Sequence, residues 1–268
     1  MSKRISALLS VPISLCIFLA ASVLFAQSVE DAPKNTQALA VAQHALIVMG
    51  ARNLVPNQSA QAIGTLTLHG ESDIVFPVVL KSAGTQRLRT EITTNTGLRL
   101  FVVNGGRGII RQPDGSVRQL ADENMIVQRI NHIPALSLLG ECLQKNVALD
   151  YIGTSTLDDA IVEIVAVSLY SGATVKDAQS LQSRTRILYY VDAKTGLVIR
   201  IDRANYAENN PNEVQNEETY LSDYRLVNGI MIPFQQRTLA DGKPYLDLVL
   251  TSVTFGVAVN DSDFSLGQ

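Results

Sequence analysis

The stretch TYLSDYRLVNGIMIPFQQR, residues 219–237, decides the fold of this chain. Two runs rich in aromatic and aliphatic residues flank Asn228-Gly229, and Asn-Gly supplies the positive φ angles that a tight hairpin turn requires. Just upstream, residues 185–203 repeat the design around the turn Asp192-Ala-Lys-Thr-Gly196. Downstream, Asp241-Gly242 leads into another strand pattern at residues 245–255. The C-terminal third is therefore predicted to be a series of antiparallel strands.

The upstream half shows the same alternation of apolar and polar residues, with turn residues every eight to twelve positions, which is typical of an antiparallel sheet. The predicted strands there cover residues 62–69, 74–81, 86–93, 98–104, 108–112, 116–120, 147–154 and 160–169. Two polar segments, residues 171–183 and 204–218, are predicted to be loops.

Helical patterns are few. Asn35-Thr36 can cap a helix that runs to Met49 and ends at Gly50, and two further helices are predicted at residues 122–130 and 135–144. The fold class is α+β and mainly β: about ten strands in a curved antiparallel sheet that forms an incomplete barrel. A sheet of that length should curl, and two to three helices suit its concave face better than its outside.

The first 26 residues carry the secretory signal pattern. Lys3 and Arg4 precede an apolar run, and Ala26 offers a small residue for cleavage. An uncleaved anchor in the inner membrane is the alternative, because the run approaches the roughly 20 residues that span a bilayer. Residues 27–34 are then a polar tether, and residues 35–268 form a single domain that is exported to the periplasm, with no other segment long enough to span a membrane.

Composition excludes several classes of function. The chain has 22 basic and 25 acidic residues, and loss of Lys3 and Arg4 would make its net charge of −3 more negative, so nucleic acid is not an expected partner. The leader contains one of the two cysteines, and Cys142 lies in an apolar run that favours a small buried residue over a nucleophile.

No catalytic or metal-binding signature is present in the sequence. The three histidines, His44, His69 and His132, have no metal-ligand spacing, and no G-x-S-x-G or S-x-x-K motif occurs. The adjacent carboxylates Asp158-Asp159 and Glu217-Glu218 cannot face each other across a cleft as glycosidase carboxylates do. We expect no enzyme activity, no metal and no cofactor.

The turn motifs resemble those of a known family. Residues 189–200 (YYVDAKTGLVIR), 224–234 (YRLVNGIMIPF) and 257–264 (VAVNDSDF) are similar to motifs of the outer-membrane lipoprotein-sorting, or LolA-like, carriers and their periplasmic relatives. The chain departs from the pattern at Val198, where proline is usual. The resemblance implies an incomplete barrel closed by helices over an apolar cavity, which in the carriers takes the acyl chains of lipoproteins.

Two functions follow as hypotheses: binding of a lipid or acyl chain in the half-barrel, or a filled-core interaction module that acts as an envelope sensor or scaffold with a protein partner. If the cavity is open, the residues expected to line it are Leu39, Leu46, Met49, Leu88, Leu136, Leu139 and Leu143. Arg87 and Arg89 share one face of a strand and could meet a lipid headgroup or a partner's carboxylate, although pairing with Glu91 or simple solvation explains them as well.

Overall fold

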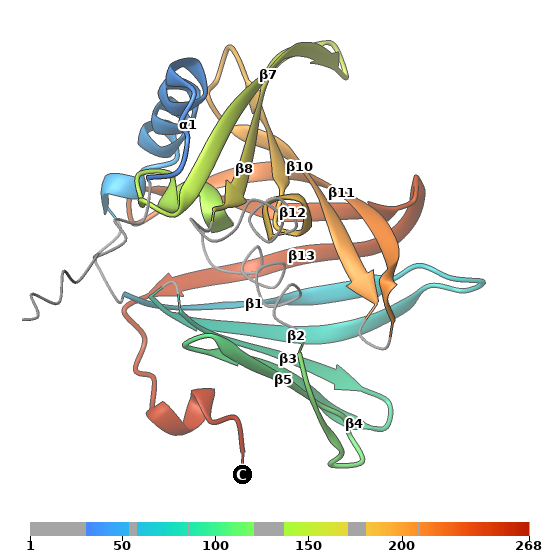
Figure 1. The fold of residues 1–268 in the computed structure, drawn as a ribbon. Coiled ribbons are helices and arrows are strands. Elements are labelled where there is room, and N and C mark those ends of the chain that lie inside the picture. The colour runs from blue at the N-terminus through green and yellow to red at the C-terminus, as the bar shows by residue number, and fades with distance from the viewer. Residues whose placement is uncertain are drawn as a thin grey trace, which may run out of the picture.

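The computed structural model describes residues 31–53, 58–84, 86–120, 137–170, 181–207 and 210–267. In this part of the chain, thirteen strands form one sheet (Figure 1). The strands are β1 (Ser59–Leu68), β2 (Ile74–Ala83), β3 (Arg87–Thr94), β4 (Gly97–Asn104), β5 (Arg107–Arg111), β6 (Val117–Gln119), β7 (Val147–Leu157), β8 (Ala160–Leu169), β9 (Ile187–Asp192), β10 (Val198–Ala207), β11 (Asn210–Val227), β12 (Ile230–Ala240) and β13 (Lys243–Phe255). The helices are α1 (Thr36–Val48) and the short 3₁₀ turns η1 (Ala51–Asn53), η3 (Ser137–Glu141) and η4 (Asp261–Phe264).

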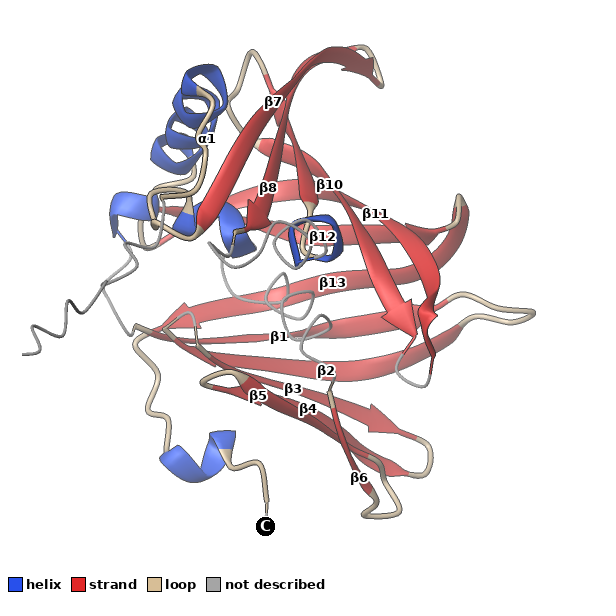
Figure 2. Ribbon diagram, in the orientation of Figure 1, coloured by secondary structure: helices blue, strands red, loops and turns tan. Residues whose placement is uncertain are grey.

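The sheet consists of two antiparallel meanders that the first and last strands join. The strand order is β6-β5-β4-β3-β2-β1-β13-β12-β11-β10-β9-β8-β7, and β1 pairs with both β2 and β13. Strands β6 and β7 form the two edges, and the sheet bends so that β7 and β8 lie above β1 to β5 (Figure 2). The predicted curved antiparallel sheet, an incomplete barrel with helices, is confirmed.

Helix α1 packs against β7 and β8. Asn35 caps it, because its side-chain Oδ1 accepts hydrogen bonds from the backbone N–H groups of Gln37 (2.9 Å) and Ala38 (3.1 Å). The helix is fixed to the sheet through small side chains, since its fully buried positions are Ala38, Ala42 and Ala45. Just before the helix, the backbone of Lys34 forms an isolated parallel β-bridge with Leu149 of β7.

Two glycine turns explain how closely α1 approaches the sheet. Gly196, in the β9–β10 turn, has a φ of +73°, and a Cβ there would lie 2.8 Å from Val48 Cγ2 of the helix. Gly50 ends the helix at a φ of +74°, and a Cβ there would meet the carbonyl oxygen of Gly229 in the β11–β12 turn. The turns that carry the sequence resemblance therefore also seat the C-terminal end of α1.

The structure corrects three details of the prediction. The sheet has thirteen strands rather than about ten. Much of the segment 204–218 is not a loop, because β10 and β11 continue through it as a ribbon in which Arg203 is opposite Glu217 and Asn205 is opposite Gln215. Glu217 is 3 % exposed, and its carboxylate accepts hydrogen bonds from both Arg203 and Asn205, so polar residues here satisfy one another across the strands.

The predicted helix at 135–144 is the shorter 3₁₀ turn η3 in its described part. The predicted helix at 122–130 lies outside the described residues, as does most of the predicted loop at 171–183, of which residues 181–184 are helical. Among the described residues, no helix is long and apolar enough to cross a membrane.

Candidate functional site

The two faces of the sheet carry different chemistry. We call the inner face the one that bears Tyr189, Leu248 and Leu66, because α1 and η3 pack on it, and the outer face the opposite one, which bears Arg200 and Arg237. Strand register places every second residue on the same face, so the inner face can be followed from strand to strand.

The inner face is mostly apolar across the sheet. Cross-strand partners Leu221, Gln236, Leu248, Leu66 and Phe76 form one continuous row from β11 to β2. At the α1 end of the sheet, Leu138 and Leu139 of η3 join helix and strand residues in one cluster in which both side chains are fully buried. Along β1, β2 and β13 the inner face keeps half-buried apolar side chains, namely Leu68, Phe76 and Leu246.

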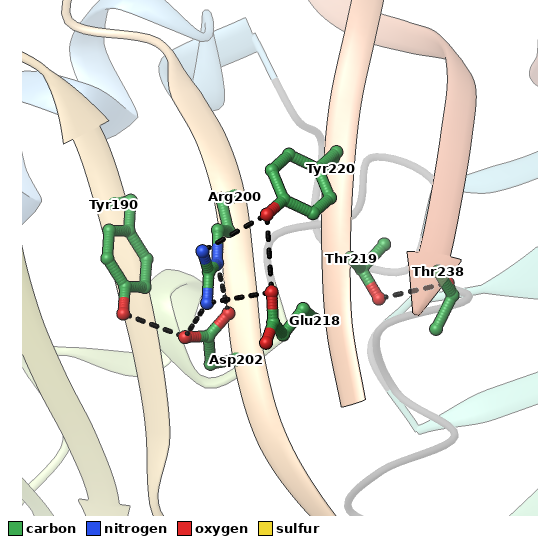
Figure 3. Close-up of polar contacts among 7 residues, drawn as sticks. All are labelled: Tyr190, Arg200, Asp202, Glu218, Thr219, Tyr220 and Thr238. Atoms are coloured by element: carbon green, nitrogen blue, oxygen red, sulfur yellow. Dashed lines mark hydrogen bonds and ion pairs between the residues drawn. The ribbon is translucent and has the colours of Figure 1, made fainter. Parts of the chain in front are cut away.

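The inner face also carries a few polar groups. The Thr219 and Thr238 hydroxyls lie 3.1 Å apart and are buried, and Figure 3 shows this pair on neighbouring strands. The buried hydroxyl of Thr90 has no hydrogen-bond partner among the described residues. In the described residues no group of three or more His, Cys, Asp or Glu side chains could hold a metal ion.

The structure places the predicted cavity residues in several environments. Met49 and Leu139 are fully buried in the cluster beneath α1, and Leu39 and Leu46 pack half-buried against it. The other described positions, Leu88 and Leu143, do not join that cluster: Leu88 is buried in a separate cluster with Val103, Ile110 and Leu120, and Leu143 is 68 % exposed. Leu136 lies outside the described residues.

The predicted binding arginines contact the end of their own chain. Arg87 and Arg89 do share the outer face of β3, as expected. Arg87 Nη1 donates to Asp261 (2.9 Å), and its guanidinium lies 5.1 Å from the ring of Phe264. Arg89 donates to Glu91 (2.6 Å) and to the backbone carbonyl of Asp263 (3.1 Å). Both arginines are therefore bound to the C-terminal segment.

Cys142 matches its expected role as a buried apolar residue. Its side chain is 1 % exposed and packs beside Leu138 and Leu139. Burial raises the pKa of the thiol, which keeps it protonated and unreactive at neutral pH.

One arrangement on the outer face was not predicted from the sequence. Tyr190, Arg200, Tyr220 and Arg237 are cross-strand partners on four neighbouring strands, and each guanidinium lies over the ring of a neighbouring tyrosine (Figure 3 shows the first three). The distances from guanidinium carbon to ring centre are 4.8 Å for Arg200–Tyr190, 5.2 Å for Arg200–Tyr220 and 5.2 Å for Arg237–Tyr220. The sequence shows that each of these strands contains a Tyr or an Arg, but only the strand register shows that the four residues are aligned.

Carboxylates hold the centre of this row in place. Arg200 donates to both oxygens of Asp202 (2.6 and 2.8 Å) and lies 3.0 Å from Glu218. Burial and the hydrogen bond to Asp202 raise the pKa of Tyr190 to about 12, so this phenol stays protonated at physiological pH.

Comparison with known proteins agrees with this geometry. The sequence matches no family model and no curated protein. Solved structures do match. A domain described as an outer membrane lipoprotein-sorting protein from Vibrio parahaemolyticus superposes with a TM-score of 0.57 at 9 % identity, over 85 % of this chain and 96 % of that one.

Two further structures resemble the chain equally well. A DUF1329 family protein from Desulfovibrio piger has a TM-score of 0.57 at 13 % identity, and a LolA superfamily protein from Nitrosomonas europaea has 0.56 at 11 %; each match covers 85 % of this chain and 97 % of the other. At these identities the likeness shows the fold alone. The chain has the fold of these lipoprotein-sorting and LolA superfamily structures, which is the fold that the turn motifs predicted.

Proposed function

We propose that this protein binds a hydrophobic ligand, the acyl chain of a lipid or lipoprotein, on the inner face of its half-barrel. The observation that carries the proposal is the mostly apolar inner face of the central strands, on which Leu68, Phe76 and Leu246 are only half-buried. Half-buried apolar side chains that line the inside of a curved sheet are what an acyl chain would cover.

Burial of methylene groups would supply the binding energy. Each methylene removed from water contributes about 0.8 kcal/mol, so a chain of roughly twelve gives about 10 kcal/mol before the cost of ordering it. No covalent step is needed, because binding and release depend only on access to the inner face. The protein would then act as a carrier rather than an enzyme.

Similarity of fold supports the same proposal. One structural neighbour is described as a lipoprotein-sorting domain and another as a LolA superfamily protein. At 9 % and 11 % identity these neighbours share the architecture, so the choice of ligand has to come from this chain's own side chains. With the leader at residues 1–26, we place the protein in the periplasm, either free after cleavage or anchored at its N-terminus.

A matched pair of variants tests the proposal. Phe76 and Val75 are neighbours on β2 with side chains on opposite faces, the first half-buried on the inner face and the second 59 % exposed on the outer face. Phe76→Arg places a charge on the inner face and should weaken the binding of a fluorescent fatty acid at least tenfold, whereas Val75→Arg should leave it unchanged. Equal affinity of both variants, with both folded by circular dichroism, would exclude the inner face as the site.

The alternative function is an interaction module in the cell envelope. It is favoured by exposed apolar residues on the outer face of three neighbouring strands: Ile63 is 42 % exposed, Val75 59 % and Val249 40 %. Exposed apolar side chains that gather on one face can mark a protein contact. This function would be supported by a stoichiometric protein partner recovered by crosslinking from a protein that carries no lipid.

A further inference from the structure

A second candidate site lies on the outer face of the sheet. A surface pocket of about 550 Å³ opens beside the β7–β8 turn and over strands β10 to β13. Its outer-face lining includes Tyr220, Gln235 and Arg237, and the hairpin contributes Leu157. The volume falls within the roughly 300–1,000 Å³ of small-molecule sites.

The pocket lies at the end of the Tyr–Arg row, where the two arginines differ. Arg200 is saturated, because Asp202, Glu218 and the hydroxyl of Tyr220 all accept from or pair with its guanidinium. Arg237 is exposed, and among the described residues its one close partner is the ring of Tyr220 at 5.2 Å. A guanidinium held against an aromatic face keeps its N–H donors free for an anion.

The surroundings of Arg237 combine hydrogen-bonding groups with apolar surface. Ser222 and Gln235 are exposed cross-strand partners in the pocket and lie within hydrogen-bonding reach of each other (3.4 Å). Apolar side chains complete the lining: Leu157 and Ile199 are half-buried, and Val249 is 40 % exposed. Such a lining suits a ligand with one polar end and an apolar body.

Two carboxylates also line the pocket and set its selectivity. Asp247 is the cross-strand partner of Arg237, but it pairs with His69 instead, with 3.2 Å between its Oδ2 and His69 Nε2. Asp158, in the β7–β8 turn, is exposed and lines the same pocket as Arg237. Because both acids repel anions, the affinity for a small free anion is low, and the apolar contacts have to provide a large share of the binding energy.

We propose that this outer pocket binds an amphiphilic anion, whose phosphate or carboxylate group pairs with Arg237 while its apolar part lies against Leu157, Ile199 and Val249. This inference rests on one pocket that combines an apolar wall with a guanidinium that stacks on Tyr220 and has no hydrogen-bond or ion-pair partner among the described residues. The pocket opens on the outer face, although Leu221, Gln236 and Leu248 of the inner row also border it, and the proposal does not depend on the function proposed for the inner face.

Titration of the protein with octyl phosphate below its micelle concentration, followed by NMR shifts of backbone amides, tests the site. The amides of residues 222 and 235 should shift. Arg237→Gln should raise the Kd about tenfold or more, since hydrogen bonds to charged groups contribute about 1.5–3 kcal/mol. Arg225→Gln is the matched control: Arg225 pairs with Asp223 on β11 and does not line the pocket.

Two further arms separate the alternatives. Inorganic phosphate, tested as the free anion, should bind at least tenfold more weakly than octyl phosphate; equal affinity would overturn the amphiphile assignment. The titration is repeated in Phe76→Arg, where binding at residues 222 and 235 should persist even if the inner face no longer binds lipid. An unchanged Kd in Arg237→Gln, or no shift at these amides, would overturn the site.

Discussion

At the scale of single residues, His69 is the clearest case of paired charges. Its Nδ1 lies 3.0 Å from Asp73 in the β1–β2 turn, and its Nε2 lies 3.2 Å from Asp247 on β13. The hydrogen bond with Asp73, and then that with Asp247, raises the pKa of His69 above its ordinary value of 6.5. The imidazolium therefore links a turn to the strand beside it.

The raised pKa fixes the sign of a pH effect. The folded protein binds this proton more tightly than the unfolded chain, so the contribution of His69 to stability is complete below pH 6.5 and is lost as the pH rises through the folded pKa. We expect an NMR titration to place His69 above 6.5, and Asp73→Asn to lower that value. A His69 that titrates at or below 6.5 in the unmodified protein would contradict the pairing.

Residue chemistry shows what sequence alone could supply. Alternation correctly placed Arg87 and Arg89 on one face of β3, but their partners at the C-terminus are 174 positions away, and no pattern connects the two. The row of Tyr190, Arg200, Tyr220 and Arg237 was missed for the same reason. The sequence shows each residue on its own strand, but the register of the strands, which brings the four side chains together, cannot be read from it. The predicted set of cavity residues has the same weakness, because the sequence does not show which apolar residues meet: Leu88 and Leu143 lie apart from the cluster beneath α1.

At the scale of elements, α1 shows how a periodic pattern can predict the right helix but only part of its buried face. The helix and its Asn35 cap were predicted, and the apolar stripe was expected to contain Leu39, Ala42, Leu46 and Met49. In the structure Ala42 and Met49 are fully buried as expected, but so are Ala38 and Ala45, whereas the two leucines are half-buried. Small residues are favoured at these positions because the helix has to approach the glycine turns closely.

Helix α1 provides its own matched test of this packing. Ala42 is fully buried and Ala40 is exposed on the same helix. Leucine and alanine have similar helix propensities, so any difference reports packing alone. Ala42→Leu should lower the free energy of unfolding by about 1–3 kcal/mol through overpacking, and Ala40→Leu should change it by less than about 0.5 kcal/mol. Urea unfolding measures both, and equal effects would mean that α1 is not tightly seated.

The β10–β11 ribbon shows the opposite error. A polar composition predicted a solvated loop at residues 204–218, but the structure forms a strand pair there. Glu217 is buried because Arg203 and Asn205 bind both of its oxygens. A polar composition does not by itself predict a solvated loop, because polar side chains can pair with one another across two strands.

At the scale of the whole molecule, local patterns identified nearly every strand, but not the order of the sheet. The pairing of β1 with β13 joins residues almost 200 positions apart, and no turn signal marks it. That long-range pairing places β1 and β2 beside β13, and so makes one inner face from two meanders. The resemblance of the turn motifs implied an incomplete barrel, but it did not specify this pairing.

The central claim, that the inner face binds an acyl chain, is tested most directly by native mass spectrometry of the protein purified after export, followed by lipid extraction. We predict a bound mass that matches a phospholipid, fatty acid or lipoprotein acyl chain, and its loss from the Phe76→Arg variant but not from Val75→Arg. A clean apo mass that stays unchanged after incubation with lipids would contradict the claim and favour the interaction module.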